Sequence, residues 1–242
     1  MEENETSPRQ QFWLGSKHTL PIVTGVIPFG LIFGVLAIEE GVPALLAWST
    51  SSLVFAGSAQ FLALPLFGEG APFIILVLTT FIINLRHLLY SASLASYAEG
   101  LSVRWKVLLS YLLTDEAYAP TIVHYQNEAV PQTYKHWYWL GSGLTLWTTW
   151  QLTTGLGVLV GGQLLPDGLG LEFTLSLTFI GIVMPQLINR PAIASAVSAG
   201  LVAVVAYSLP YRLNLMLAAV VGIAVGLWLE KRQTDLMEGA NE

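Results

Sequence analysis

Residues 81–94, FIINLRHLLYSASL, place Asn84, Arg86 and His87 inside an apolar run. An arginine at the centre of a membrane helix costs about 2.5–3.5 kcal/mol on insertion scales, so it is found there when it faces protein, water or an opposite charge. A guanidinium can hold a carboxylate through two parallel hydrogen bonds. This segment therefore predicts a binding site for an anionic group.

Two adjacent carboxylates, Asp115 and Glu116, lie near the middle of the next apolar segment along the chain. Because only a short connection at 97–102 separates the two segments, we expect them to be antiparallel neighbours. Adjacent helical positions point ~100° apart, so one carboxylate can pair with Arg86 while the other faces a cavity. The alternative is structural: an ion pair that pins two helices together, and an interhelical hydrogen bond for His87.

A third group of polar residues lies in residues 44–67 and includes Gly57, Ser58 and Gln60. Small residues allow helices to pack closely, which is the simpler interpretation of the serines. The Gln60 amide, however, needs partners at depth, and a glycine three residues earlier lets a helix open and expose its backbone to a cavity. We therefore add these three residues to the candidate site, with Phe55 as an apolar neighbour.

These candidates must be positioned by membrane helices. Of the 242 residues 54% are hydrophobic and only 11% charged, with a mean hydropathy of +0.61, whereas soluble domains carry about 25% charged residues. Lipid leaves backbone groups without water, so spanning segments of ~20 residues are helical. We predict an all-α integral membrane protein, a polytopic bundle of about eight hydrophobic segments. They are 20–38, 44–67, 72–96, 103–123, 137–162, 169–189, 192–209 and 211–230.

The organisation along the chain is predicted as one transmembrane domain, 20–230, between cytoplasmic tails at 1–19 and 231–242, in the inner (plasma) membrane. In an alternative arrangement the second and sixth segments enter and return on the same side. This arrangement places more Lys and Arg in the cytoplasm. It also leaves three crossings in each half, so that repeats 20–123 and 137–230 would be inverted, as in many secondary transporters. A weak echo fits such a repeat: GVL at 34–36 followed by FAG at 55–57 is similar to GVL at 157–159 followed by FIG at 179–181.

Several other function classes fit the sequence less well. The chain has no cysteine and no basic block, so we expect no thiol–metal site, no cofactor and no nucleic-acid partner. An intramembrane hydrolase could pair Ser58 or Ser142 with His87, but nothing in the sequence places nucleophile and base in register. A passive channel would need rings of charge or carbonyl groups, which an oligomer could supply. We therefore expect a transporter without catalytic residues.

Three ordered blocks resemble the AzlC family, the large subunit of branched-chain amino acid exporters. They are FAGSAQF at 55–61, RHLLYSASL at 86–94 and LTDE at 113–116. The resemblance implies export of leucine, isoleucine, valine or close analogues, in partnership with a small AzlD-like membrane subunit. Asn84 departs from members that carry an acid there, which argues against a proton-carrying role for this position.

The residues and the resemblance predict the same mechanism. An amino acid needs an anion partner, a cation partner and an apolar pocket. Arg86 would hold the carboxylate, and Asp115 or Glu116 would hold the ammonium or carry a coupling proton. The Gln60 amide and backbone near Gly57 would complete the polar contacts, with Phe55 receiving the branched side chain.

Overall fold

The computed structural model describes residues 7–127, 134–161, 180, 184, 187–209 and 213–238, which form helices and contain no strand. The chain divides into two compact units, residues 1–68 with 76–167 and residues 69–75 with 168–242. The all-α class is therefore confirmed for the described residues. Among the described residues, two helices are long and apolar enough to span a membrane, or three if one bent pair counts as a span. Most of the predicted segment 169–189 lies outside the described residues.

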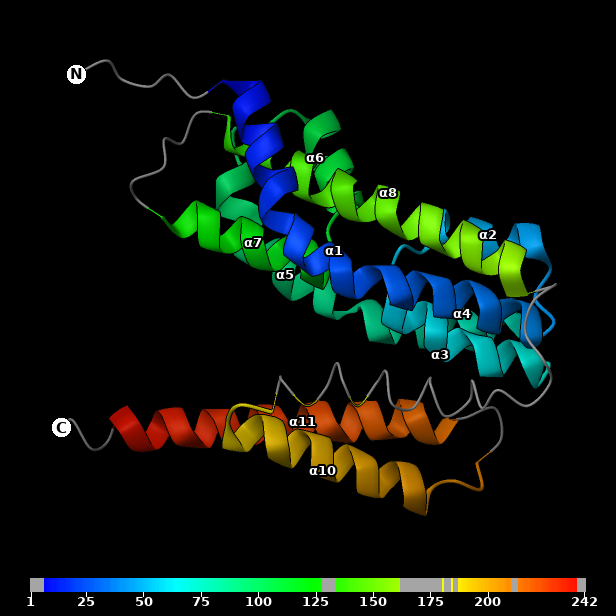
Figure 1. The fold of residues 1–242 in the computed structure, drawn as a ribbon. Helices are drawn as coiled ribbons and strands as arrows, with labels where there is room; N and C mark the ends of the chain where they lie inside the picture. Colours follow the sequence, from blue (N-terminus) through cyan, green and yellow to red (C-terminus); the bar gives the residue numbers. More distant parts are fainter. Residues whose placement is uncertain are drawn as a thin grey trace. The chain divides into compact units, whose positions relative to one another are not determined.

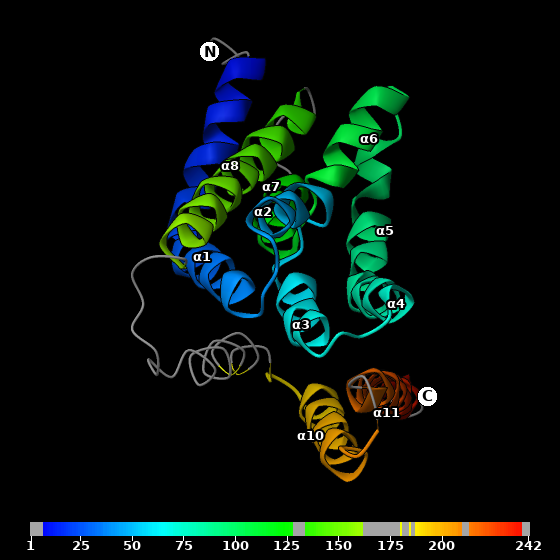
Figure 2. The same cartoon turned by 90° about the vertical axis from the view of Figure 1, so that its right-hand side faces the viewer.

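Two long helices, α1 (Pro8–Glu39) and α8 (Lys135–Gly161), run side by side in the first unit (Figures 1 and 2). Helix α1 begins at Pro8 because Ser7 caps it: the Ser7 hydroxyl accepts from the Gln10 backbone N–H, and the Gln10 side chain accepts from the Ser7 N–H. Gln11 and Thr19 are buried. Residues 8–19 thus belong to the packed helix rather than to the tail expected at 1–19.

Glycines bring α1 and α8 into backbone contact. A Cβ on Gly34 would collide with the Thr154 carbonyl oxygen, and one on Gly157 would collide with the Leu31 carbonyl oxygen. Gly15 meets Tyr138 in the same way, so residue numbers rise together along both helices. The two helices are therefore parallel, whereas inverted halves at 20–123 and 137–230 would make these two first helices antiparallel.

The second apolar segment is broken into α2 (Ala44–Leu53) and α3 (Gly57–Gly68), which form a hairpin. At the turn Phe55 has φ +43°, the left-handed region that side chains rarely adopt. At the other end of α3, a Cβ on Gly68 would collide with the Glu40 carboxylate, just after the end of α1. Helix α3 therefore returns to the end of the bundle where α2 begins, and the expected break near Gly57 is confirmed.

The third segment consists of α4 (Phe73–Asn84) and α5 (Arg86–Ala98), bent by 41° at Leu85. Its second half packs on α7 through stacked Tyr90 and Tyr118 rings, 4.7 Å between centroids. The break places Arg86 at the first position of α5, inside the bundle.

The fourth segment is a second hairpin, formed by α6 (Val103–Tyr111) and α7 (Asp115–Gln126). Tyr90 meets Tyr118 and Tyr97 meets Tyr125, so α7 runs parallel to α5. The expectation of one helix over 103–123, antiparallel to the third segment, is therefore wrong. The chain turns back because Thr114 starts a new helix, accepting a hydrogen bond from the Ala117 N–H.

The second unit contains α10 (Arg190–Val205) and α11 (Leu213–Glu238), which pack together. Asn189 caps α10 by accepting from the Ala192 N–H, and the Ser195 hydroxyl donates to the Gly222 carbonyl oxygen at 2.7 Å. Helix α11 continues to Glu238, past residue 230 where a tail was expected. The echo at residues 179–181 falls largely outside the described residues.

Candidate functional site

The tips of the two hairpins meet. The Tyr111 hydroxyl, at the end of α6, donates to the Ser52 carbonyl oxygen on α2 at 2.7 Å. The Tyr111 ring also lies 6.1 Å from the Phe55 ring, in the turn between α2 and α3. Since α2–α3 and α6–α7 enter the unit from opposite ends, their turns lie inside it.

Arg86 connects the break between α4 and α5 to both hairpins. Its Nη1 donates to Asp115 Oδ2 at 3.0 Å and its Nη2 donates to Ser58 Oγ at 2.6 Å. The Arg86 and Asp115 side chains are 29% and 32% exposed, so the pair is only partly shielded. The ion pair expected between Arg86 and one of the two carboxylates is confirmed, and Asp115 provides it. We call Ser58, Asn84, Arg86 and Asp115 the Arg86 group.

Six helix ends surround this group: the C-terminal ends of α2, α4 and α6 and the N-terminal ends of α3, α5 and α7. Helix N-termini carry partial positive charge and unpaired N–H groups, while C-termini carry partial negative charge and unpaired carbonyls. Because α3 and α7 run in opposite directions, their N-termini face each other across Arg86. The site therefore offers partners for both an anion and a cation.

Two buried polar atoms of the Arg86 group, Arg86 Nε and Asn84 Oδ1, have no hydrogen-bond partner in the described part of the chain. An unsatisfied buried donor or acceptor costs about 1–3 kcal/mol. His87 Nδ1 pairs with the Asn84 carbonyl oxygen at 3.1 Å across the helix break, whereas the structural alternative for His87 was an interhelical hydrogen bond. The unpaired donor and the unpaired acceptor therefore come from two residues on either side of the same helix break.

Gln60 is 3% exposed, and protein groups occupy its amide. Nε2 donates to Thr50 Oγ1 at 3.1 Å and Ser51 Oγ at 3.2 Å, and Oε1 accepts from Trp150 Nε1 at 3.1 Å. Gly57 leaves room for the same indole, since a Cβ there would lie 3.1 Å from Trp150 Cη2. Gln60 and Gly57 thus join α2, α3 and α8 behind the Arg86 group.

The remaining candidates lie beside the Arg86 group. Phe55 is 6% exposed, and half-buried Glu116 follows Asp115 in the first turn of α7. Tyr111 and Trp150 were not predicted as site residues, yet their polar atoms bind the hairpin tip and the Gln60 amide. The available signal was the presence of hydrogen-bonding aromatics in the middle of apolar segments, where such donors need partners.

Comparisons with known proteins cover this site. A family model described as AzlC protein matches residues 21–164. An uncharacterized membrane protein of Archaeoglobus fulgidus is 31% identical over 92% of this chain and 97% of its own length. The inner membrane protein YgaZ of Escherichia coli is 28% identical over 76% of this chain and 73% of its own. A Bacillus subtilis protein named branched-chain amino acid transport protein AzlC is 27% identical over 74% and 70%. No solved structure matches the chain.

Proposed function

Because the chain belongs to the AzlC family, we propose that it is a secondary transporter that exports branched-chain amino acids from the cell. A relative bears the name of a branched-chain amino acid transport protein, and others are named membrane proteins. The proposal places the chain in the inner (plasma) membrane with both termini in the cytoplasm. It makes the chain the large subunit of a two-component permease, with an AzlD-like small subunit.

The observation that carries this proposal is the meeting of six helix ends around the Arg86 group. A free amino acid is a zwitterion, and a site with both N-terminal and C-terminal helix ends has a partner for each charge. Discontinuous helices at mid-bundle are the usual way in which secondary transporters build such sites. Phe55 supplies apolar surface for a branched side chain beside the same turn.

The unpaired atoms define how the amino acid would be held. A guanidinium has five N–H donors, and the bonds to Asp115 and Ser58 use two of them. Nε and Nη2 form one edge of the guanidinium, which a carboxylate can meet with two parallel hydrogen bonds. We assign the substrate carboxylate to this edge. The ammonium is assigned to Asn84 Oδ1 and Asp115, and Glu116 is assigned the coupling proton.

Access to these atoms requires movement, because Arg86 Nε and Asn84 Oδ1 are covered by protein. Helices α1 and α8 are in backbone contact, whereas side-chain hydrogen bonds hold the α2–α3 hairpin on α8. We therefore assign the movement to the hairpins, because side-chain contacts rearrange more easily than backbone contacts. Displacement of α2–α3 would open the site toward one side, and displacement of α6–α7 toward the other. This is alternating access around a fixed site.

Counterflow in proteoliposomes tests the proposal. The purified chain is reconstituted into liposomes, with and without the small subunit. The liposomes are loaded with unlabelled leucine and assayed for uptake of labelled leucine, isoleucine and valine. We expect saturable exchange of all three. 3-Methylbutylamine and 4-methylpentanoate, which each lack one charged group, should not exchange. Non-saturable flux of the analogues would indicate a channel, and labelling of Ser58 or Ser142 by a covalent serine probe would indicate a hydrolase.

A further inference from the structure

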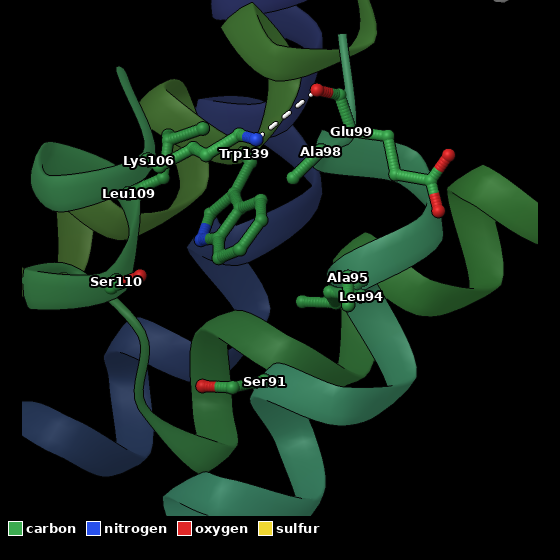
Figure 3. Close-up of a pocket in the computed structure, with 9 residues that line it drawn as sticks. All are labelled: Ser91, Leu94, Ala95, Ala98, Glu99, Lys106, Leu109, Ser110 and Trp139. Carbon is green, nitrogen blue, oxygen red and sulfur yellow. Dashed lines mark hydrogen bonds between the residues drawn. The ribbon is translucent and has the colours of Figure 1, made fainter. Parts of the chain in front are cut away.

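A cavity of about 360 Å³ lies between α5, α6 and α8 (Figure 3). This volume falls in the range of small-molecule sites, ~300–1,000 Å³. None of its lining residues belongs to the Arg86 group. They are Ser91, Leu94, Ala95, Ala98, Glu99, Lys106, Leu109, Ser110 and Trp139.

One wall of the cavity contains a buried donor. Trp139 is 4% exposed, and its Nε1 has no hydrogen-bond partner among the described residues. Figure 3 shows Nε1 turned toward the side formed by Leu109 and Ser110. A buried indole N–H normally finds a partner. This donor therefore indicates an acceptor that the described residues do not provide.

The polar groups around the cavity favour an anion. Lys106 reaches over it and donates to the Glu99 carbonyl oxygen at 3.1 Å, which uses one of its three N–H donors. Glu99 is the only acid among the lining residues, and its carboxylate points away from the cavity (Figure 3). Ser91 and Ser110 add hydroxyl groups.

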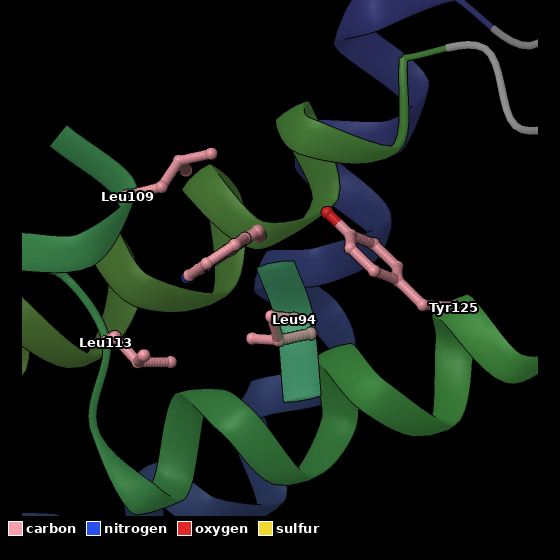
Figure 4. Close-up of a cluster of buried hydrophobic side chains, with 5 residues drawn as sticks. Leu94, Leu109, Leu113 and Tyr125 are labelled. Atoms are coloured by element: carbon pink, nitrogen blue, oxygen red, sulfur yellow. The ribbon is translucent and has the colours of Figure 1, made fainter. Parts of the chain in front are cut away.

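The rest of the cavity is apolar and narrow. Leu94 and Leu109 belong to the buried cluster of Figure 4, together with Leu113, Tyr125 and Trp139. The part of the cavity wall that these two leucines form is therefore packed against other buried side chains. Ala95 and Ala98 leave the open space because their side chains are short. A short branched hydrocarbon chain fits such a surface.

We propose that this cavity is a second binding site, for a small monocarboxylate with a short branched apolar chain. Its carboxylate accepts from Trp139 Nε1 and faces the Lys106 ammonium, and its chain lies on Leu94, Ala98 and Leu109. Among the described lining residues no acid points inward to require an ammonium, so the site takes the deaminated acid as well as the amino acid. This recognition is separate from that of the Arg86 group.

The position of the cavity suggests its use. Ser91 lies five residues after Arg86 on α5, ~7.5 Å along the helix axis. The cavity extends from there to Glu99 and Lys106 at the end of the α5–α6 connection. The cavity would bind the solute by its carboxylate before the solute moves on to the Arg86 group. This use of the cavity rests on the proposed function.

Thiol protection tests the site, because the natural chain has no cysteine. Ala98→Cys places a thiol in the cavity, and Ser102→Cys places one in the nearby connection as a control. We expect 3-methylbutanoate to slow modification of the Ala98→Cys protein by N-ethylmaleimide several-fold, without effect on the control. 3-Methylbutylamine, with the same chain and opposite charge, should not protect. Ser110→Cys repeats the measurement from the opposite wall.

Second substitutions identify the recognition groups. Trp139→Phe and Lys106→Gln should each raise the half-protecting concentration of the acid about ten-fold, the usual effect of losing a hydrogen bond to a charged group. Trp137→Phe, which does not line the cavity, should leave it unchanged. Arg86→Gln should retain protection while abolishing counterflow, so a failure of the proposed function and a failure of this site are distinguishable.

Three results would overturn the proposal. Equal protection by the acid and the amine would exclude carboxylate recognition. Full protection in both Trp139→Phe and Lys106→Gln would show that these donors are not used. Protection in detergent that disappears in phospholipid liposomes would assign the cavity to a lipid instead of the acid.

Discussion

Arg86 is bound by one residue from each hairpin, so its substitution affects both stability and recognition. Removing one member of a buried pair typically costs ~3–5 kcal/mol, and partial exposure reduces this, so we expect Arg86→Gln to lose about 1–3 kcal/mol of unfolding free energy. Combining it with Asp115→Asn should restore stability without restoring transport. Thermal unfolding in detergent and counterflow in liposomes, measured on the single and double variants, give the two results.

The matched control for this prediction is Asp115→Asn alone, which leaves the Arg86 charge unpaired and should lose stability similarly. If the double variant regains both stability and full counterflow, Arg86 only pins the helices and does not hold the carboxylate. Retained stability without transport in the double variant would support the assigned role.

Gln60 is expected to act through stability. Gln60→Leu removes three hydrogen bonds and leaves the buried Trp150 N–H without an acceptor, which costs about 1–3 kcal/mol. The thermal midpoint in detergent should fall by several degrees. Ser49→Ala, which removes only a bond within α2, is the control and should change the midpoint little. An unchanged midpoint in Gln60→Leu would show that its amide is dispensable for packing.

At the scale of the elements, the contact between α1 and α8 depends on glycine. Gly157→Ala introduces a Cβ that collides with the Leu31 carbonyl oxygen. Because this oxygen belongs to the backbone of α1, relieving the collision requires a shift of the helix, which costs free energy. We expect a loss of about 1–3 kcal/mol, measured by thermal unfolding. Gly25→Ala is the control on α1, because its Cβ would meet nothing within 4 Å. It should be neutral or stabilise by roughly 0.5–1 kcal/mol, as Ala favours a helix over Gly. Similar losses in both variants would contradict the close approach.

The helix breaks were predictable to different degrees. The break before Gly57 could be inferred, because a glycine, serines and Gln60 together are unusual in an apolar segment. The turn at 112–114 could not be inferred from hydropathy, since two short apolar helices in sequence have the same profile as one span. Its local signal is Thr114 followed by Asp115 and Glu116, the pattern of a helix N-terminus. We interpreted those acids as partners for Arg86. Asp115 is such a partner and is also the first residue of α7.

For the whole molecule, the two hairpins predict an unusual topology in the membrane. Helix α3 ends at Gly68, at one end of the first unit, whereas residues 100 and 127 both follow helices that return to the other end. A single cysteine at Glu69 should therefore react with an impermeant thiol reagent from the periplasm. Single cysteines at Gly100 and Asn127 should react only from the cytoplasm. Eight simple crossings would place residues 100 and 127 on opposite sides, which labelling of intact cells would reveal.

The family could be predicted from the sequence because three short blocks, 55–61, 86–94 and 113–116, carry the resemblance, and the same blocks contain the candidate site residues. The structure places these blocks at three helix breaks, which explains why polar residues gather there in an otherwise apolar chain. The count of crossings was not accessible, because composition measures how apolar a segment is and not whether the chain turns within it. The cavity beside Trp139 depends on packing among three helices, which no local pattern encodes.

The hydrogen bond between Tyr111 and Ser52 joins the tips of hairpins that enter from opposite ends, and Trp147 Nε1 donates to the same hydroxyl at 2.7 Å. A transporter must never open to both sides together, since its solute would then run down its gradient. In the proposed transporter this phenol would therefore act as the seal between the two sides of the membrane. Tyr111→Phe should convert coupled exchange into a passive leak. The leak is measured as efflux of labelled leucine from liposomes when the external solution contains no amino acid to exchange.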